Sequence, residues 1–237
     1  MTKSIKLALS IVVILLSGCS SQNPDPLEKI NRPIFAFNKG VDKVVIKPIA
    51  KVYDAIIPNP IQKGISNAFL NVGEFPIIIN NLLQLKIGSA ITDTWRLIIN
   101  STMGVGGLYD PATYFGLKRN YQDFGLTLSR WGINTAYFVI PILGPSTITD
   151  AIGLLVDYEF FMVYPYIDSK TLRYSLLGLD MIRLRVELLP TDKVVDEAFD
   201  PYVLLRDAYK QRRNYLLTQQ ENKNDIYNLE NEVSLVN

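Results

Sequence analysis

The least polar and most aromatic stretch of the chain is Asp123–Asp150, which reads DFGLTLSRWGINTAYFVIPILGPSTITD. Within it, the segment 136–145 has no charged or amide side chain, and its only breaks are Pro141, Gly144 and Pro145. Ten residues are too few to cross a bilayer as a helix, which takes roughly 20. Because so apolar a run is unusual on a water-facing surface, we expect it to lie in a core or against lipid.

The end of this stretch has the pattern of a helix start. The Gly-Pro pair stops whatever precedes it. Ser146 and Thr147 then offer capping hydroxyls, and Asp150 falls in the first turn of the next helix. The residues alone favour a buried segment followed by a capped helix, and a short strand or hairpin arm is an option over 135–142.

The first 18 residues have the pattern of an export signal. Lys3 and Lys6 give a positive start, an apolar run follows, and the Leu-Ser-Gly-Cys junction ending at Cys19 resembles a bacterial lipobox. Cys19 is the only cysteine, and we expect it to become the acylated first residue of the mature protein. An ordinary secretory signal and an uncleaved anchor are the alternatives. Ser20 in place of Asp is typical of lipoproteins sorted to the outer membrane.

The charges of the mature chain are balanced, because removal of the two leader lysines leaves acidic and basic side chains nearly equal in number. This balance gives no argument for nucleic acid and no electrostatic pull toward anionic lipid, so membrane contact beyond the anchor has to be apolar. The remaining length suits one domain. We expect a tether over 19–24, a domain over 25–220 and a polar, disordered tail over 221–237.

Helices are predicted from apolar periodicity and from four Asx-Pro pairs, which join a capping side chain to the residue favoured at the first helical position. The pairs begin at Asp25, Asn59, Asp110 and Asp200, and Glu28 adds a capping box to the first. The predicted helices are 25–39, 47–57, 59–71, 74–86, 89–100, 122–131, 146–163, 168–189 and 200–219.

Two of these helices combine a narrow polar stripe with a wide apolar face. In 168–189, Asp180, Arg183 and Glu187 are spaced to form ion pairs along the helix. One interpretation packs both helices inside a domain, and the other turns their apolar faces toward lipid acyl chains. The stripe of the helix over 74–86 consists of amides: Asn80, Asn81 and Gln84.

The residues needed for common enzyme chemistry are scarce. The sequence has no His and a single Cys, which removes His-based triads, thiol catalysis and Cys- or His-based zinc sites. The Gly-rich loop 103–108 lacks the spacing of a nucleotide fingerprint. The acids Asp192, Asp196 and Glu197 are left as candidates for acid–base catalysis, but acids on a helix face are more often solvated surface. A binding or conducting role without a cofactor or a metal is therefore favoured over an enzyme.

Six motifs in sequence order, spread over about 25–213, resemble the VacJ/MlaA family of outer-membrane lipoproteins. Any one of them is weak, but the ordered set is specific. They are Asp25-Pro26-Leu27-Glu28 with Asn31-Arg32 and Phe35-Ala36-Phe37-Asn38; Asn71-Val72-Gly73-Glu74 with Asn80-Asn81-Leu82-Leu83-Gln84; Asn100-Ser101-Thr102-Met103-Gly104 with Gly106-Gly107-Leu108 and Asp110; Asp123-Phe124-Gly125 with Trp131-Gly132; Pro141 with Gly144-Pro145-Ser146-Thr147 and Asp150; and Asp200-Pro201-Tyr202 with Arg206-Asp207-Ala208-Tyr209.

The resemblance implies a mainly α fold: a ring-like bundle of amphipathic helices, anchored by lipid and sunk in the periplasmic leaflet of the outer membrane, with an amphipathic passage through it. It also implies removal of misplaced phospholipid from the outer leaflet, transfer to a soluble periplasmic carrier and association with a trimeric porin. Many members carry longer C-terminal tails. From the match we expect these residues to line or gate the passage: Tyr137, Phe138, Ile140, Pro141, Ile142, Gly144, Pro145, Ser146 and Thr147.

Two other functions compete with lipid translocation. A structural adaptor would bind porins or other envelope proteins through the same apolar faces without conducting lipid, and a lipid-cleaving enzyme is the third and weakest option. Intact lipid in stoichiometric amounts in the purified protein separates the first function from the second. Released fatty acid would support the third.

Overall fold

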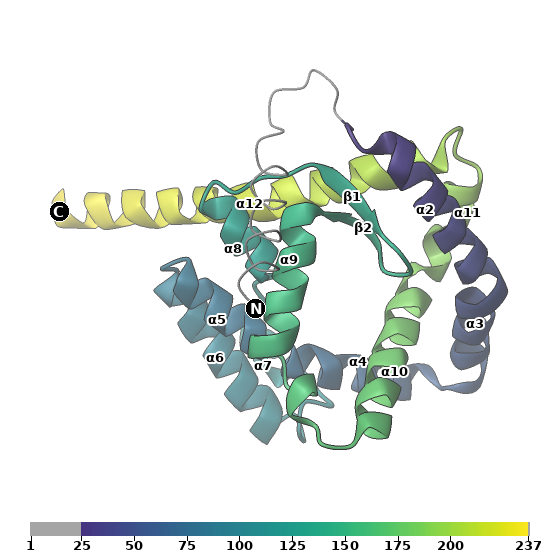
Figure 1. The fold of residues 1–237 in the computed structure, drawn as a ribbon. Helices are drawn as coiled ribbons and strands as arrows, with labels where there is room; N and C mark the ends of the chain where they lie inside the picture. Colours follow the sequence, from purple (N-terminus) through teal and green to yellow (C-terminus); the bar gives the residue numbers. More distant parts are fainter. Residues whose placement is uncertain (1–24, 237) are drawn as a thin grey trace, which may run out of the picture.

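The computed structural model describes the backbone of residues 25–236 and the side chains of residues 25–218. It is mainly helical, as the sequence predicts, with one two-stranded hairpin. Figure 1 shows most of the elements following one another around a ring, from which the C-terminal helix projects. The expected signal peptide, the acylated Cys19 and the tether lie outside the described residues.

The N-terminal arc of the ring is a nearly continuous helical rod. It consists of α2 (Glu28–Val41), the π-helical turn η1 (Asp42–Ile46) and α3 (Lys47–Ile56). The sequence predicts a break between residues 39 and 47, but the structure has none, because a π-helical turn joins the two helices. After a short connection, α4 (Asn59–Val72) continues the ring.

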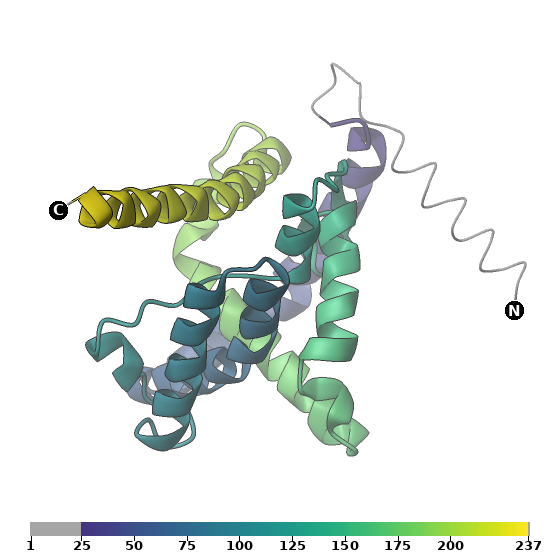
Figure 2. The same ribbon diagram turned by 90° about the vertical axis from the view of Figure 1, so that its left-hand side faces the viewer.

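Two antiparallel helices form the next layer. They are α5 (Glu74–Leu83) and α6 (Ile87–Thr102), which pack along one another and lie side by side in Figures 1 and 2. Two short helices follow, α7 (Pro111–Tyr114) and α8 (Phe124–Arg130). The side chain of Asp123 caps α8 by accepting a hydrogen bond from the N–H of residue 126.

A β-hairpin separates this half of the ring from the next. Strand β1 (Tyr137–Ile140) pairs antiparallel with β2 (Gly144–Thr147), and α9 (Ile148–Val156) starts directly after it. The strand considered over 135–142 is thus confirmed. The helix predicted over 146–163 starts two residues late, because residues 146 and 147 complete the hairpin, and it ends in the π-helical turn η2 (Asp157–Phe161).

The longest internal helix, α10 (Lys170–Leu188), confirms the prediction over 168–189. Its Arg183 lies 2.7 Å from Asp180 and 2.8 Å from Glu187, so the predicted ion pairs form. The disorder of the tail beyond residue 220 stays a prediction. The remaining elements are η3 (Tyr164–Tyr166), η4 (Leu189–Thr191), α11 (Asp192–Asp196) and α12 (Pro201–Val236).

The structure confirms two of the four predicted Asx caps. Asp110 and Asp200 accept hydrogen bonds from backbone N–H groups in the first turn of α7 and α12. The other two predictions are wrong. Asp25 is buried and accepts a hydrogen bond from the Tyr202 hydroxyl, and Asn59 lies inside α4, which has no side-chain cap.

The interior of the molecule is polar. Among the described residues, buried polar and charged side chains outnumber buried apolar ones, while many large apolar side chains are exposed. Buried polar groups of this kind have to be hydrogen-bonded. None of the described helices is long and apolar enough to cross a membrane. The apolar cluster is small and consists of Tyr137, Val139 and Tyr202, with Ile34, Phe35, Val203 and Tyr209 against it.

Candidate functional site

The hairpin carries the residues that the sequence selects as the candidate passage. Its strands pair in register from Tyr137 opposite Thr147 to Ile140 opposite Gly144. The turn between the strands is exposed at Pro141–Leu143. The hairpin therefore has an exposed apolar tip at this turn, at the opposite end from the Tyr137–Thr147 pair.

An amide from α2 holds the outer edge of β1. The Asn31 side chain donates from Nδ2 to the carbonyl of Tyr137 (3.1 Å), and its Oδ1 accepts from the N–H of Val139 (3.0 Å). Asn31 is 0% exposed, so both backbone groups are satisfied inside the protein. This side chain takes the place of a third strand and protects an edge that would otherwise be open.

A second amide repeats this arrangement at the tip. Asn38 lies seven residues further along α2, on the same face of the helix. It donates to the carbonyl of Ile140 (2.9 Å) and accepts from the N–H of Ile142 (2.7 Å). Ile142 has a φ of 69°, a left-handed conformation that is rare for a β-branched residue and costs roughly 1–2 kcal/mol. Strained positions of this kind concentrate at ligand clamps and switch regions.

The candidate residues fall into three groups by their exposure. Tyr137 and Ser146 are buried, and burial raises the pKa of the Tyr137 hydroxyl to about 12. Pro141 and Ile142 are exposed at the tip, whereas Phe138, Ile140, Gly144, Pro145 and Thr147 are half-buried. The exposed and half-buried residues are the ones that a ligand could reach without a change of the fold.

Thr147 connects the hairpin to α9. Its hydroxyl accepts a hydrogen bond from the N–H of Asp150 (3.0 Å), so it is the N-cap of α9, one of the two caps that the sequence allows. Helices α8 and α9 then approach closely at two glycines. A Cβ on Gly153 would lie 2.2 Å from the backbone nitrogen of Gly125, so neither position has room for a side chain.

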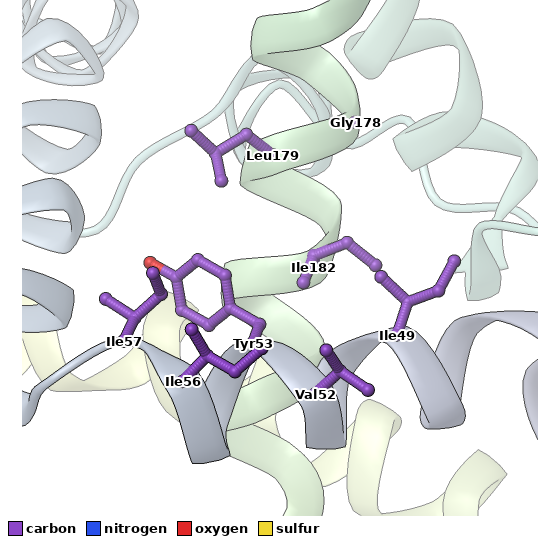
Figure 3. Close-up of a pocket in the computed structure, with 8 residues that line it drawn as sticks. All are labelled: Ile49, Val52, Tyr53, Ile56, Ile57, Gly178, Leu179 and Ile182. Atoms are coloured by element: carbon purple, nitrogen blue, oxygen red, sulfur yellow. The ribbon is translucent and has the colours of Figure 1, made fainter.

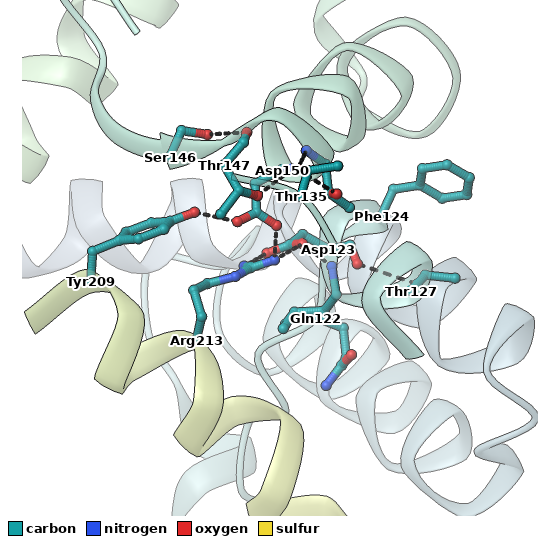
Figure 4. Close-up of polar contacts among 12 residues, drawn as sticks. Gln122, Asp123, Phe124, Thr127, Thr135, Ser146, Thr147, Asp150, Tyr209 and Arg213 are labelled. Atoms are coloured by element: carbon teal, nitrogen blue, oxygen red, sulfur yellow. Dashed lines mark hydrogen bonds and ion pairs between the residues drawn. The ribbon is translucent and has the colours of Figure 1, made fainter. Parts of the chain in front are cut away.

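A cluster of charged and phenolic side chains binds α12 to this unit (Figure 4). The Arg213 guanidinium bridges Asp123, the cap of α8, and Asp150, in the first turn of α9. The Tyr209 hydroxyl donates to Asp150 as well. Sequence reasoning missed this cluster, since its members lie up to 90 residues apart along the chain. We name Asp123, Asp150, Tyr209 and Arg213 the α12 latch.

A chain of hydrogen bonds fills the space between α5, α8 and η2. Asn80 donates to Asp157 (2.8 Å) and accepts from the Thr127 hydroxyl (2.8 Å), which accepts in turn from Gln84 (2.8 Å). Asp157 also accepts from the N–H of Phe124 (2.8 Å). Burial of its charge raises the pKa of Asp157 to about 6.

A second polar cluster joins α5, α6 and α7. Arg96, whose side chain is 4% exposed, lies 3.2 Å from Glu74 and 2.9 Å from Asp110. Beside it, the Asn81 amide donates to Asp93 (2.8 Å). Burial raises the pKa of Glu74 to about 7 and that of Asp93 to about 6. These contacts use side chains where a water-soluble bundle would use apolar packing.

Helix α5 shows which way the apolar faces turn. Asn80 and Asn81 are 0% exposed, whereas Leu82 is 46% exposed and Leu85, just beyond the helix, is 84% exposed. The amide stripe therefore faces the interior, which is the reverse of a helix on a water-soluble surface. The structure favours the second interpretation of this helix, in which its apolar face points outward.

The acidic residues that the sequence marks as a possible catalytic group are in ion pairs. Asp192 lies 2.9 Å from Lys47 and 2.7 Å from Arg185, and Asp196 lies 3.2 Å from Lys39. Among the described side chains, residues 25–218, no group of three or more His, Cys, Asp and Glu residues could hold a metal ion. The paired acids join α11 to the α2–α3 rod and to α10.

Buried polar contacts, many exposed apolar side chains and helices arranged in a ring (Figure 1) define a class: a mainly helical, ring-shaped protein with apolar surface on its outside. The chain belongs to the MlaA lipoprotein family, whose model matches residues 23–216. This confirms the resemblance inferred from the six motifs.

Relatives and a solved structure agree with this assignment. The intermembrane phospholipid transport system lipoprotein MlaA of Escherichia coli (strain K12) is 31% identical over 235 residues, which cover 92% of this chain and 92% of that protein. A protein of Rickettsia bellii is 34% identical over 201 residues, covering 84% and 78%. A solved structure described as "Structural basis for maintenance of bacterial outer membrane lipid asymmetry" superposes with a TM-score of 0.73 at 30% identity, covering 82% of this chain and 100% of that one.

Proposed function

We propose that this protein is an outer-membrane lipoprotein that removes mislocalised phospholipid from the outer leaflet and passes it to a soluble periplasmic carrier. The observation that carries the proposal is the inverted distribution of polarity. Helices such as α5 bury their amides and expose leucines, an arrangement that is typical of a surface that meets lipid or another protein instead of water. The relatives named as phospholipid transport lipoproteins support it.

The anchor of the proposed protein is Cys19, acylated after removal of residues 1–18. The Leu-Ser-Gly-Cys junction after a charged, then apolar, leader supports this processing. Mass spectrometry of the mature N-terminus should give a lipid-modified Cys19 as the first residue. An unmodified Cys19, or cleavage at another residue, would remove the anchor from the proposal.

The lipid path of the proposal runs along the hairpin tip. Ile140 is half-buried and Ile142 is 50% exposed, so a carboxylate at either position keeps contact with water or polar headgroups. At Ile142, Asp also tolerates the left-handed backbone better than Ile does. We expect Ile140→Asp and Ile142→Asp to fold and to be acylated, while cells that carry them accumulate phospholipid in the outer leaflet as a deletion would.

The matched control is Val139→Asp, on the same strand. Val139 is 0% exposed and belongs to the apolar cluster, so an unpaired charge there should unfold the protein. Loss of folded protein in all three variants would mean that the tip is ordinary core. Normal lipid asymmetry in cells with folded Ile140→Asp and Ile142→Asp would remove the hairpin from the path.

The proposed partners are phospholipid, a trimeric porin and the periplasmic carrier. The exposed apolar side chains also suit a structural adaptor that binds a porin without conducting lipid, and lipid analysis of the protein extracted in mild detergent separates the two functions. Intact phospholipid in stoichiometric amounts supports transport, and its absence supports the adaptor. Released fatty acid would contradict the proposal that the protein is not an enzyme.

A further inference from the structure

Helices α3 and α10 line an apolar pocket of about 300 Å³ (Figure 3). Small-ligand pockets run from roughly 300 to 1,000 Å³, so this one has room for a single hydrocarbon chain but not for both chains of a diacyl lipid. Its walls are mostly branched aliphatic side chains, which offer no partner to a charged group. They include Ile49, Val52 and Ile56 on α3 and Leu179 and Ile182 on α10.

The absence of a side chain at Gly178 keeps this pocket open. Glycine is the poorest helix former after proline, yet Gly178 lies in the interior of α10. Close packing explains Gly125 and Gly153, where a Cβ would meet backbone atoms within 3 Å. A Cβ on Gly178 would meet nothing within 4 Å, so no neighbouring helix requires glycine there. A larger side chain at position 178 would instead fill part of the pocket.

The Tyr53 ring lines the pocket, and its hydroxyl is the polar group next to the apolar lining. It is buried and has no hydrogen-bond partner among the described residues, and burial raises its pKa. Figure 3 shows the ring reaching across the pocket from α3. A buried donor without an acceptor is costly. An occupant with a neutral acceptor would relieve that cost once a shift of the surrounding side chains opens the hydroxyl to the pocket.

The nearby cation is already engaged. Arg183 lowers the pKa of Tyr53 by its charge, but its guanidinium is held by Asp180 and Glu187 at 2.7–2.8 Å and by the Ser66 hydroxyl at 3.0 Å. It is therefore not available for a phosphate. The chemistry of the pocket fits the neutral part of a lipid, namely an acyl chain and its ester carbonyl, and does not fit a headgroup.

We infer that the α3–α10 pocket binds one ester-linked acyl chain of a glycerophospholipid, with Gly178 leaving room for the chain and the Tyr53 hydroxyl donating to the ester carbonyl. The inference rests on the proposed function, because it names where a lipid in transit is held. It is separate from the hairpin, which lies on other elements of the ring.

Photocrosslinking tests the site. The full-length acylated protein in mild detergent is mixed with phosphatidylethanolamine that carries a diazirine in one acyl chain, irradiated and mapped by mass spectrometry. We expect labelling of the pocket residues on α3 and α10, and a loss of about tenfold in Gly178→Leu. In Tyr53→Phe the loss should be about fivefold, the equivalent of one neutral hydrogen bond.

The matched control is Gly88→Leu in α6, another helical glycine whose Cβ would meet nothing within 4 Å. It should leave pocket labelling unchanged, and both leucine variants should keep the melting temperature of the parent or raise it, since leucine is the better helix former.

Unchanged labelling in folded Gly178→Leu would overturn the site, and so would label spread evenly over all exposed apolar helices. A parent protein that maintains lipid asymmetry in cells but shows no pocket label would overturn this inference alone. A parent that does not support asymmetry would overturn the proposed function.

Discussion

At the scale of single residues, the buried carboxylates make stability depend on pH. Asp157 is 2% exposed and its folded pKa is raised from 3.8 to about 6, first by burial and also by the charge of Asp123, while Arg213 and the hydrogen bonds from Asn80 and Phe124 oppose the rise. The folded protein holds the Asp157 proton more tightly than the unfolded chain does. The protonated carboxyl therefore stabilises the fold, and this contribution to the free energy of unfolding is fully present below about pH 4. It is lost as the pH rises to about 6.

A shift of this size corresponds to about 3 kcal/mol. Asp157→Asn removes the titration, so the fall in unfolding free energy between pH 4 and 6 should shrink by about that amount. Chemical unfolding in detergent at several pH values measures it. The comparison uses the slope of unfolding free energy against pH and not its absolute value, because the variant also changes the hydrogen bond from Asn80. A slope equal to that of the parent would show that the Asp157 carboxylate is not the group that titrates.

At the scale of elements, Asn31 fixes the hairpin to α2. Asn31→Leu keeps the same number and branching of side-chain heavy atoms but leaves the carbonyl of Tyr137 and the N–H of Val139 unpaired in the interior. At roughly 1–3 kcal/mol for each unsatisfied group, we expect a loss of about 3 kcal/mol. Asn38→Leu should cost less, because the N–H of Ile142 lies at the exposed tip. Thermal unfolding compares the two, and equal losses would contradict the docking argument.

The α12 latch makes a separate prediction. Arg213→Met leaves the carboxylates of Asp123 and Asp150 without their shared cation, and removal of one partner from a buried pair costs roughly 3–5 kcal/mol. Asp123 is partly exposed, so we expect a loss of stability at the lower end of this range. Because α12 is then held less firmly, trypsin should cleave faster at Lys210 and Arg212. The double variant Arg213→Met with Asp150→Asn should recover part of the loss. Cleavage at the rate of the parent would show that the latch does not hold α12.

Sequence patterns predicted the elements well where the signal is local. The Asp110 and Asp200 caps, the ion pairs of Arg183 and the Thr147 cap each depend on residues at most four positions apart. The contacts that position the candidate site do not. Asn31 reaches β1 across more than 100 residues, and a lone asparagine in a helix gives no sign of such a partner.

The same limit explains the capping error at Asp25. The sequence of an Asp-Pro pair is the same whether the carboxylate caps a helix or is buried in the interior. The Tyr202 hydroxyl, which donates a hydrogen bond to the buried Asp25, lies 177 residues away along the chain. The direction of the α5 stripe was ambiguous for another reason. Periodicity shows that a helix has two faces, but it does not show which face meets water and which meets lipid.

At the scale of the whole molecule, the exposed apolar side chains should bind lipid without help from the anchor. The described side chains include exposed Phe, Ile, Leu and Trp residues on α2 through α10, and each buried CH₂ contributes about 0.8 kcal/mol. Acidic and basic side chains are nearly equal in number in the sequence, so we expect no dependence on anionic lipid.

A chain that begins at residue 20, purified in detergent and transferred to vesicles, tests this expectation by flotation. It should bind neutral phosphatidylcholine vesicles and vesicles with added phosphatidylglycerol to within about twofold, in low salt and in 1 M NaCl alike, because apolar burial is insensitive to screening. Leu85→Glu changes a side chain that is 84% exposed, so it should weaken binding without lowering the melting temperature.

Binding only to anionic vesicles at low salt would mean that charge, and not the apolar exterior, holds the protein at the membrane. A chain that stays in the aqueous fraction would assign all membrane attachment to the proposed lipid on Cys19.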